Sequence, residues 1–350
     1  TRSKWTFYTL FNYNEASIIR KIVAFFNKML DNLVLPPFIH FFGVPLMFGR
    51  PQARLGVDVL PCAFDCVLYH PKTASIIAAK QFNCLDDDFA SAINAWLHCV
   101  WQHPVSIHCS LPRKQTSQCA VPIEKTWSKQ DILAQLQVNA SDYFPQLSQE
   151  NTERPLAIDY VLQDNPSASH TKTITAFAAD NADIKKHIDL MAPINNATLK
   201  TIEPEQNALF RFAQQRESAA DCLFINCSKT LFRFLIIKNN RCHDDGSLLA
   251  PTDSTRFFID LLSSLVDIPE KIIIACHHSM INPLKKSCLS VDKIPCFLDE
   301  STLKNASPVA LGLVLNERTH TCFFSRKTSK KGAQIINLLP WRENKINLKK

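Results

Sequence analysis

The chain has 350 residues, 46% of them apolar, and a formal net charge of +7. This length and composition allow a sizeable buried core, in two domains or in one large two-lobed domain. From residue 318 onward there are nine Lys or Arg and one acid, so the rest of the chain has a net charge of −1. A basic tail on a nearly neutral body argues against a nucleic-acid-binding surface on that body.

Residues 1–46 are expected to be an N-terminal extension that is not part of the native fold, with translation starting at Met47. Within it, residues 16–32 carry apolar side chains at helical spacing with basic residues between them, which is also typical of a membrane-surface helix. The most apolar stretch, residues 33–48, is shorter than the roughly 20 residues that span a bilayer and contains three prolines. No clean signal peptide is visible.

Beyond Met47 the apolar pattern alternates between the period of a strand and that of a helix. In chain order it predicts two hairpin strands within 55–70, a strand over 74–82, a helix over 86–101, a strand over 105–112, a helix over 129–144 capped by Ser128, strands over 156–162 and 172–179, and helices over 181–191 and 208–215.

The order strand, strand, helix then returns. The pattern predicts strands over 221–228, 230–238 and 271–277, and helices over 256–265 and 309–317, the last beginning at Ser307 and Pro308. Two similar halves that each begin with a β-hairpin predict an internal duplication, with ligands in the crevice between them. The predicted fold class is α/β, and an actin-like fold is one option within it.

Six short runs of residues add a resemblance to a known family. They are GVDV (56–59), CSLP (109–112), NASDYFP (139–145), IDYVL (158–162), EPEQNALFR (203–211) and ALGLVL (310–315). In this order they resemble the motifs of the PilM family, cytoplasmic actin-like proteins of the type IV pilus inner-membrane platform. The resemblance implies a duplicated, RNase H-like actin fold over residues 47–317, with an inserted α+β subdomain at about 104–180.

The C-terminus is similar to a second protein of the same platform. INLLPWRE, residues 336–343, resembles the cytoplasmic N-terminus of PilN, the single-pass membrane partner of PilM. The implied partner-peptide motif is Ile336, Asn337, Leu338, Leu339, Pro340 and Trp341. It lies in a docking peptide of residues 335–350, which a basic linker, 318–334, joins to the body.

The residue types suit a docked extended peptide. Pro340 favours an extended backbone at Leu339, and Asn337 can satisfy backbone groups on the edge of a receptor strand. A flexible linker of about 20 residues spans roughly 25 Å, so docking within the same chain is expected. The alternative is an unstructured basic tail with a chance apolar patch.

An actin-like nucleotide site needs glycines where backbone N–H groups approach phosphates, and acids that hold Mg²⁺. The resemblance implies that Asp58, Asn226 and Ser228 stand at nucleotide-binding positions. Asp58 is the acid that is kept, but Leu60 and Pro61 replace the first glycine loop. Residues 226–228 lack the acid and the glycine of the second loop, and residues 275–278 replace the glycines of the adenosine loop.

We therefore expect no cofactor and no hydrolysis, with Asp58 paired or capping a turn instead of binding a metal. Binding of ATP and Mg²⁺ stays open. The runs 276–278 and 242–245 contain residue types that bind metals. They lack the separated pairs of a zinc site, so buried thiols and loop histidines are the simpler interpretation. Cys62 and Cys66 flank a hairpin, and no fixed arrangement of Cys, His and Asp around them suggests a nucleophile.

Three functions compete. The favoured one is a non-catalytic adaptor for type IV pilus (fimbrium) assembly or competence, which binds a PilN-like peptide and links the motor to a PilN/PilO-type alignment complex. The alternatives are a functional actin-like ATPase and a membrane-binding module that uses residues 16–32. The adaptor would be cytoplasmic, at the inner face of the inner membrane of a Gram-negative bacterium. It would reach the membrane only through its partner and contact no nucleic acid; homo-oligomerisation is left open.

Overall fold

The computed structural model describes residues 53–83, 89–148, 155–163, 171–216, 221–228, 231–239, 241–249, 269–276, 278–288, 295–299, 303, 305–315 and 336–339. All of them belong to the unit Arg50–Lys350. The expectations for residues 1–46, for the helix over 256–265, and for Pro340 and Trp341 lie outside the described residues.

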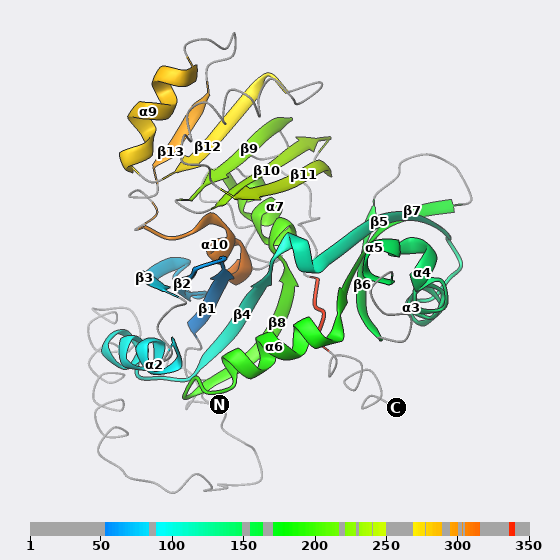
Figure 1. The fold of residues 1–350 in the computed structure, drawn as a ribbon, viewed down its shortest axis with the longest axis horizontal. Helices are drawn as coiled ribbons and strands as arrows, with labels where there is room; N and C mark the ends of the chain where they lie inside the picture. The colour runs from blue at the N-terminus through cyan, green and yellow to red at the C-terminus, as the bar shows by residue number, and fades with distance from the viewer. Residues whose placement is uncertain are drawn as a thin grey trace, which may run out of the picture. The chain divides into compact units, whose positions relative to one another are not determined.

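The first half of the unit is built on a five-stranded sheet of order β3-β2-β1-β4-β8 (Figure 1). Its strands are β1 Ala53–Val59, β2 Ala63–His70, β3 Ser75–Asn83, β4 Val105–Leu111 and β8 Ala197–Pro204. The first three are antiparallel neighbours, whereas β4 and β8 run parallel to β1. β8 is therefore an edge strand whose outer backbone groups face away from the sheet.

The second half repeats this arrangement with the order β11-β10-β9-β12-β13. Its strands are β9 Cys222–Cys227, β10 Leu231–Lys238, β11 Arg241–Leu249, β12 Lys271–Cys276 and β13 Cys296–Asp299. As in the first sheet, β11, β10 and β9 are antiparallel neighbours, whereas β12 and β13 run parallel to β9. The identical order and sense confirm the predicted duplication and the α/β fold class.

A smaller sheet, of order β5-β7-β6, is inserted between β4 and β8. Its elements are η1 Arg113–Gln115, β5 Thr116–Glu124, α3 Lys129–Val138, α4 Ala140–Tyr143, α5 Pro145–Ser148, β6 Leu156–Gln163 and β7 Thr171–Asp180. Buried side chains from this sheet and from α3 form a separate hydrophobic cluster. The insertion is thus an α+β subdomain with its own core.

The predicted helix over 129–144 is wrong in its length. Ser128 caps α3 through a complete capping box with Asp131, as the sequence suggests. The helix ends at Val138, and the side chain of the next residue, Asn139, donates back to the Gln135 carbonyl at 3.1 Å. Pro145 then begins α5, because proline fits the first position of a helix. Asparagine competes with the helical hydrogen bonds, which explains the break.

Within the described part of the chain, the remaining helices are α2 Phe89–Val100, α6 Asn181–Met191, α7 Glu205–Arg216, α9 His278–Cys288 and α10 Pro308–Val314. Figure 1 shows α7 and α10 between the two five-stranded sheets. They contribute to one buried cluster with side chains of β2, β9 and β10. This cluster joins the halves through apolar contact.

Two glycines allow α10 to pack this closely. A Cβ atom at Gly56 on β1 would collide with the carbonyl oxygen of Ala310, and one at Gly312 would collide with the carbonyl oxygen of Ala208 on α7. The backbones of the three elements are therefore in contact. The third described glycine, Gly246, lies against the ring of Phe234. The described glycines thus serve packing and do not lie in the hairpin turns.

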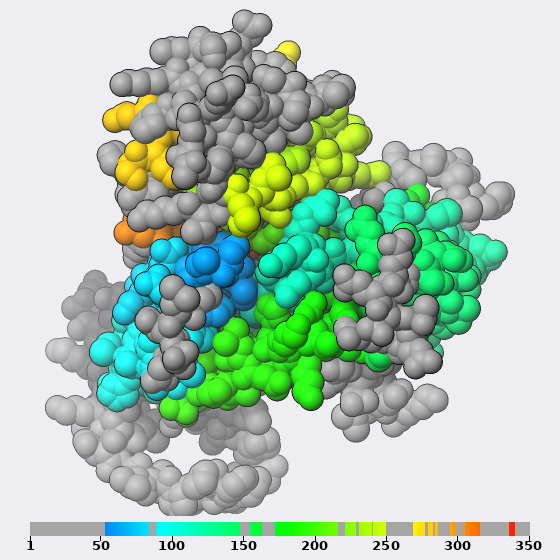
Figure 2. All heavy atoms as spheres, in the orientation of Figure 1, coloured from blue at the N-terminus to red at the C-terminus, as the bar shows by residue number. Residues whose placement is uncertain are grey.

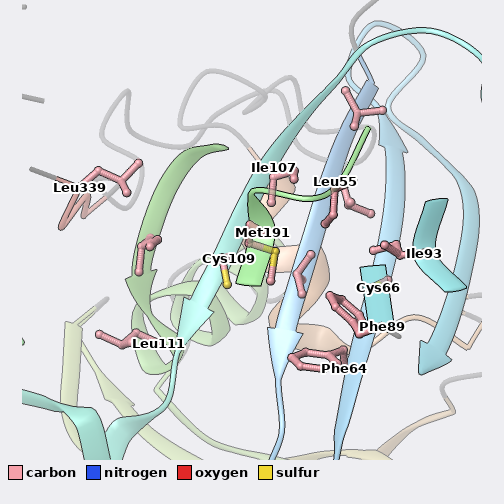
Figure 3. Packing of buried hydrophobic residues seen from close by; sticks show 14 of the residues in the cluster. Leu55, Phe64, Cys66, Phe89, Ile93, Ile107, Cys109, Leu111, Met191 and Leu339 are labelled. Carbon is pink, nitrogen blue, oxygen red and sulfur yellow. The ribbon is translucent and has the colours of Figure 1, made fainter. Parts of the chain in front are cut away.

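The core of the first half covers one face of its sheet (Figure 3). Phe64 and Phe89 lie at the β2 side of this core, and Leu339 lies at the opposite side, next to β8 (Figure 3). Ile336 and Leu338 belong to the same buried cluster. A segment from the end of the chain therefore completes a core that the first half of the chain begins.

Candidate functional site

Asp58, the acid kept from the expected nucleotide site, lies at the end of β1 and is fully buried. Arg233 on β10 approaches it from the other half. Its Nη1 donates to Asp58 Oδ2 and its Nη2 to Asp58 Oδ1, both at 2.9 Å. This is the two-pronged geometry in which a guanidinium and a carboxylate interact most strongly.

Two hydroxyls fill the remaining acceptor positions of the Asp58 carboxylate. Ser110 at the end of β4 donates its Oγ hydrogen to Oδ1 at 3.1 Å. Ser307, the predicted N-cap of α10, donates to Oδ2 at 2.9 Å. A carboxylate accepts about four hydrogen bonds, so protein donors saturate Asp58. The sequence predicted that Asp58 is paired, but it did not identify Arg233 as the partner.

A second carboxylate holds the other edge of Arg233. Glu205, in the first turn of α7, accepts from Arg233 Nε at 2.8 Å through Oε2. Its Oε1 accepts from the backbone N–H of Arg113 at 3.0 Å. Burial disfavours the charged form of Arg233, but the neighbouring carboxylates of Asp58 and Glu205 outweigh this effect and raise the pKa of the guanidinium above its ordinary value.

The hairpin turns that stand where phosphate loops would lie contact each other. Leu60 and Ala63, at the β1–β2 turn, form a buried apolar cluster with Leu231, at the β9–β10 turn. The Ser228 hydroxyl donates to the carbonyl of Leu231 and accepts from its N–H, both at 2.9 Å, so this hydroxyl closes its own turn. Asn226 is buried on β9, and its Oδ1 has no hydrogen-bond partner within the described part of the chain.

These residues do not fit a magnesium–nucleotide. Protein donors saturate Asp58, and the apolar side chains of Leu60, Ala63 and Leu231 pack together where the two turns meet. The structure brings Asp58 and Ser110 together with Arg233, Glu205 and Ser307. Arg233 could have been found from the sequence as a lone charge inside the apolar strand LFRFLIIK.

The second candidate site lies beside β8, next to residues 336–339 (Figure 1). We call it the groove, because β8 and β6 both contact this buried segment. Ile336, Leu338 and Leu339 are 0%, 2% and 3% exposed, respectively. The backbone N–H of Leu338 donates to the carbonyl of Ile202 on β8 at 2.9 Å. The segment therefore docks along the free edge of the first sheet, as peptides do when they add to an exposed strand.

Asn337 makes most of the polar contacts in this groove. Its Nδ2 donates to the carbonyl of Lys200 at 3.1 Å, and its Oδ1 accepts from the N–H of Ile202 at 3.4 Å. The same oxygen accepts from the N–H of Leu339 at 3.2 Å, which fixes the bend of the segment. One side chain thus satisfies both an acceptor and a donor on β8.

The opposite wall of the groove provides a carboxylate that the sequence analysis did not identify. Asp159 on β6 is 1% exposed, and its Oδ2 accepts from the backbone N–H of Asn337 at 2.9 Å. Between Leu156 and Leu162 it is the one buried residue. A buried acid within an apolar strand is the signal that could have predicted this position, because such a charge needs a donor from another element.

The family-like run over 203–211 has a structural role. Glu203 at the end of β8 accepts from Asn207 Nδ2 at 2.9 Å and forms a buried ion pair with Arg211. Arg211 also donates from Nε to the carbonyl of Gly312 at 2.7 Å. These contacts tie the groove strand to α7 and α10.

The other residues considered from the sequence form no metal-binding cluster where the structure describes them. Cys276 is buried at the end of β12, and the Cys242 thiol on β11 donates to the carbonyl of Asp244 at 3.5 Å. His243 lies on this strand and not in a loop, contrary to expectation. Within the described ranges, no group of three or more His, Cys, Asp or Glu could hold a metal ion. No described helix is long and apolar enough to cross a membrane.

The chain resembles known proteins in its structure. No family model matches the chain, and no curated protein matches it. Its structure is similar to that of a Bacteroides thetaiotaomicron protein with an actin-like ATPase fold and unknown function (TM-score 0.39, 9% identity, 75% of this chain and 98% of the other).

The particular similarities are more specific. The structure is similar to the PilM–PilN type IV pilus biogenesis complex, with a TM-score of 0.57 and 11% identity over 76% of this chain and 98% of the other. It is also similar to the cytoplasmic domain of EpsL, an inner membrane component of the type II secretion system of Vibrio cholerae (TM-score 0.41, 10% identity, 64% and 82%). The similarity to the PilM–PilN complex confirms the actin-like fold and the predicted resemblance to PilM at the level of the fold.

Proposed function

We propose that this chain is a non-catalytic adaptor that binds an INLLP-type peptide in the groove between β8 and β6. The observation that carries the proposal is the set of contacts made by residues 336–339. Asn337 and Leu338 bond the edge of β8, and Asp159 of β6 accepts from the peptide backbone. A short segment that buries its side chains in a distant groove has the chemistry of a peptide ligand.

The contacts explain both affinity and selectivity. Three buried apolar side chains supply the driving force, at about 1.5–3 kcal/mol for each one fully buried. Asn337 supplies the selectivity, because an apolar residue in its place would leave the N–H of Ile202 and the carbonyl of Lys200 without this partner. Ser or Ala would be too short to reach both groups. The groove therefore suits a peptide with asparagine between apolar residues.

The similarity to the PilM–PilN complex supports a PilN-like partner and a place in a pilus or competence platform. In this role the adaptor would lie at the cytoplasmic face of the inner membrane and join a motor to a PilN/PilO-type alignment complex. Membrane contact would come through the partner. The peptide in this chain would occupy the groove that the partner's N-terminus uses.

The alternative is an actin-like protein of the same platform that binds or hydrolyses ATP. It has the same fold but requires a magnesium–nucleotide between the two hairpin turns. Mg-ATP would then raise the melting temperature of the full chain, by an amount that grows with nucleotide concentration. If the chain is an adaptor, its melting temperature in Mg-ATP should equal that in MgCl₂ with the same concentration of a nucleotide that lacks the γ-phosphate.

The test of peptide binding uses the full chain with its own tail released. In the double variant Asn337→Ala/Leu338→Asp, a carboxylate replaces a buried leucine and the polar contacts of Asn337 are lost. We expect this variant to bind a synthetic peptide of residues 333–344 saturably and one to one in calorimetry. The wild-type chain should bind it far more weakly, because a tethered segment competes at an effective concentration near the millimolar range.

A matched peptide with Asn337→Ala is the control and should bind at least about tenfold more weakly. Circular dichroism verifies that the double variant is folded. The proposal is wrong if the folded variant does not bind the wild-type peptide. It is also wrong if the wild-type and tail-released chains bind the peptide equally, since the groove would then lie elsewhere.

A further inference from the structure

We infer that Arg233 is a built-in cation that takes the place of a bound metal–nucleotide in joining the two halves of the fold. The residues between the hairpin turns differ from those that a nucleotide site in an actin-like fold requires. The side chain of Arg233 is 3% exposed, and its guanidinium lies between carboxylates from β1 and α7. It is covalently part of the second half but has its main partner in the first.

The duplication shows how this arrangement arises. In the first half Asp58 and Asp65 face each other across β1 and β2, and in the second half Asn226 and Arg233 face each other across β9 and β10. The turns between them match, since Leu60 N–H bonds the carbonyl of Ala63 and Ser228 N–H bonds the carbonyl of Leu231, both at 2.9 Å. Arg233 therefore occupies the position that corresponds to Asp65.

Because an arginine stands where the first half has an aspartate, the two halves are complementary in charge. The first half presents the carboxylates of Asp58 and Asp65, and the second half presents an amide and a guanidinium at the matching positions. With acids at both positions, a bound cation would be needed to bring the halves together, because like charges in a buried site repel. With Arg233 in place, the protein supplies that cation itself.

The connection extends beyond one ion pair. Glu205 follows Pro204, the last residue of β8, and bonds both Arg233 and the backbone of Arg113. The Arg113 side chain pairs with Asp245 on β11, which Gln118 on β5 also contacts. In Figure 2 the yellow spheres of β11 lie against the blue-green spheres of β5. The three sheets are thus linked by one polar network with Arg233 inside it.

A consequence for the groove rests on the proposed function. β8 carries Ile202, which bonds the docked segment, and leads directly into Glu205, which bonds Arg233. Arg233 would therefore hold the groove strand in place without a nucleotide. This makes Arg233 a positioning residue for the groove and not a contact of the peptide.

The test is chemical rescue of Arg233→Ala in the full chain. Removing the guanidinium leaves Asp58 and Glu205 buried without their shared cation, and we expect the melting temperature to fall by roughly 10 °C. Free guanidinium at millimolar concentration fits the space that is vacated. It should restore several degrees of this loss, whereas sodium chloride at the same ionic strength should not.

Arg233→Met is the matched control. It removes the same charge but fills most of the space with an apolar side chain, so guanidinium should not rescue it. The inference is overturned if Arg233→Ala melts like the wild type, or if guanidinium and sodium chloride have equal effects on it. A rise in the melting temperature of the wild-type chain in Mg-ATP would overturn it too, because the cleft would then accept an external cation.

A second variant keeps the inference testable if Arg233→Ala does not fold. Asp58→Asn/Arg233→Met removes both charges of the central pair, so no lone charge is left at Asp58. Replacement of both partners of a buried pair costs much less than removal of one. The double variant should therefore melt higher than Arg233→Met alone. A double variant that melts no higher than the single one would overturn the inference.

Discussion

The backbone N–H of Asn337 donates to Oδ2 of Asp159 at 2.9 Å, across 178 residues of sequence. A buried carboxylate of the inserted subdomain thus binds the main chain of the docked segment, while β8 binds the side chain of Asn337. The two walls of the groove have different tasks. Asp159 fixes the position of the main chain at residue 337, and the edge of β8 bonds the side chain that the segment carries there.

Replacement of Asp159 should therefore weaken every peptide that enters the groove. A hydrogen bond to a charged group contributes about 1.5–3 kcal/mol, so Asp159→Ala in the tail-released chain should lower peptide affinity roughly 10- to 100-fold in calorimetry. Asp142→Ala on α4 is the matched control, since Asp142 is an exposed acid of the same subdomain. An unchanged affinity in Asp159→Ala would show that the carboxylate does not hold the peptide.

The apolar contacts can be tested on the peptide itself. Leu338 is 2% exposed and belongs to the core of the first half, where Leu→Ala replacements cost about 2–5 kcal/mol. A peptide with Leu338→Ala should thus bind the tail-released chain at least about 30-fold more weakly. A peptide with Asn344→Ala, outside the docked segment, should bind like the original. Equal binding by all three peptides would contradict the buried position of Leu338.

Because α10 packs closely against α7, one added methyl group on α10 should lower the stability of the fold strongly. In Gly312→Ala the new Cβ atom would collide with the backbone of α7 at Ala208, which cannot move away as a side chain would. We expect the free energy of unfolding in urea to fall by about 3–5 kcal/mol. Gly246→Ala, whose Cβ atom would meet only the Phe234 ring, should cost clearly less. Equal costs would argue against backbone contact between α7 and α10.

His108 should make the fold sensitive to acid. It lies on β4, with Nδ1 2.8 Å from the Thr201 hydroxyl, and its burial together with the charges of Arg54 and Arg211 lowers its pKa to about 3. The unfolded chain takes up a proton near the ordinary pKa of 6.5, and the folded chain does not. Stability should therefore fall as the pH decreases from about 6.5 toward 3, by about 2–3 kcal/mol at pH ~4.5.

Urea unfolding of His108→Gln measures this contribution. The variant should lose less stability than the wild type between neutral pH and pH ~4.5, even if its stability at neutral pH is lower. His98→Gln, at an exposed position of α2, should keep the wild-type pH dependence. Identical slopes in all three proteins would show that His108 is protonated in the fold.

Asp65 should make the stability of the fold depend on pH in the opposite direction. Burial and the nearby charge of Asp58 raise its pKa to about 6, and only Gln81 and Arg233 act against this shift. The folded chain thus holds a proton that the unfolded chain has released, so stability falls as the pH rises from about 4 to 6. Asp65→Asn should be about 1–3 kcal/mol more stable than the wild type at neutral pH.

The amide of Asp65→Asn can still accept the hydrogen bond that Gln81 donates at 2.8 Å, so the comparison isolates the charge. Urea unfolding at pH ~7.5 and at pH ~4 should show a gain at the higher pH that disappears at the lower one. Asp142→Asn should be neutral at both. A loss of stability in Asp65→Asn at neutral pH would mean that the Asp65 carboxylate has a favourable partner in the fold.

Much of the fold followed from local patterns. Alternating apolar residues in the two hairpins and the Ser307-Pro308 start of α10 were predicted at nearly their observed positions. β5, β8 and β11 were not predicted, because their sequences are rich in polar residues and β8 has no regular alternation. Their strand geometry comes from pairing with neighbours that are distant in sequence, which overrides weak local preference.

The sequence by itself determined that the chain is a duplicated α/β protein and that its hairpin turns lack glycine, and it predicts a docking peptide at INLLP. These properties depend on residue type and spacing within short windows. Only the tertiary structure decided that Arg233 neutralises Asp58 and that Asp159 and β8 form the groove. The partners in both sites lie more than a hundred residues apart, and a buried charge in a sequence does not specify which distant residue will balance it.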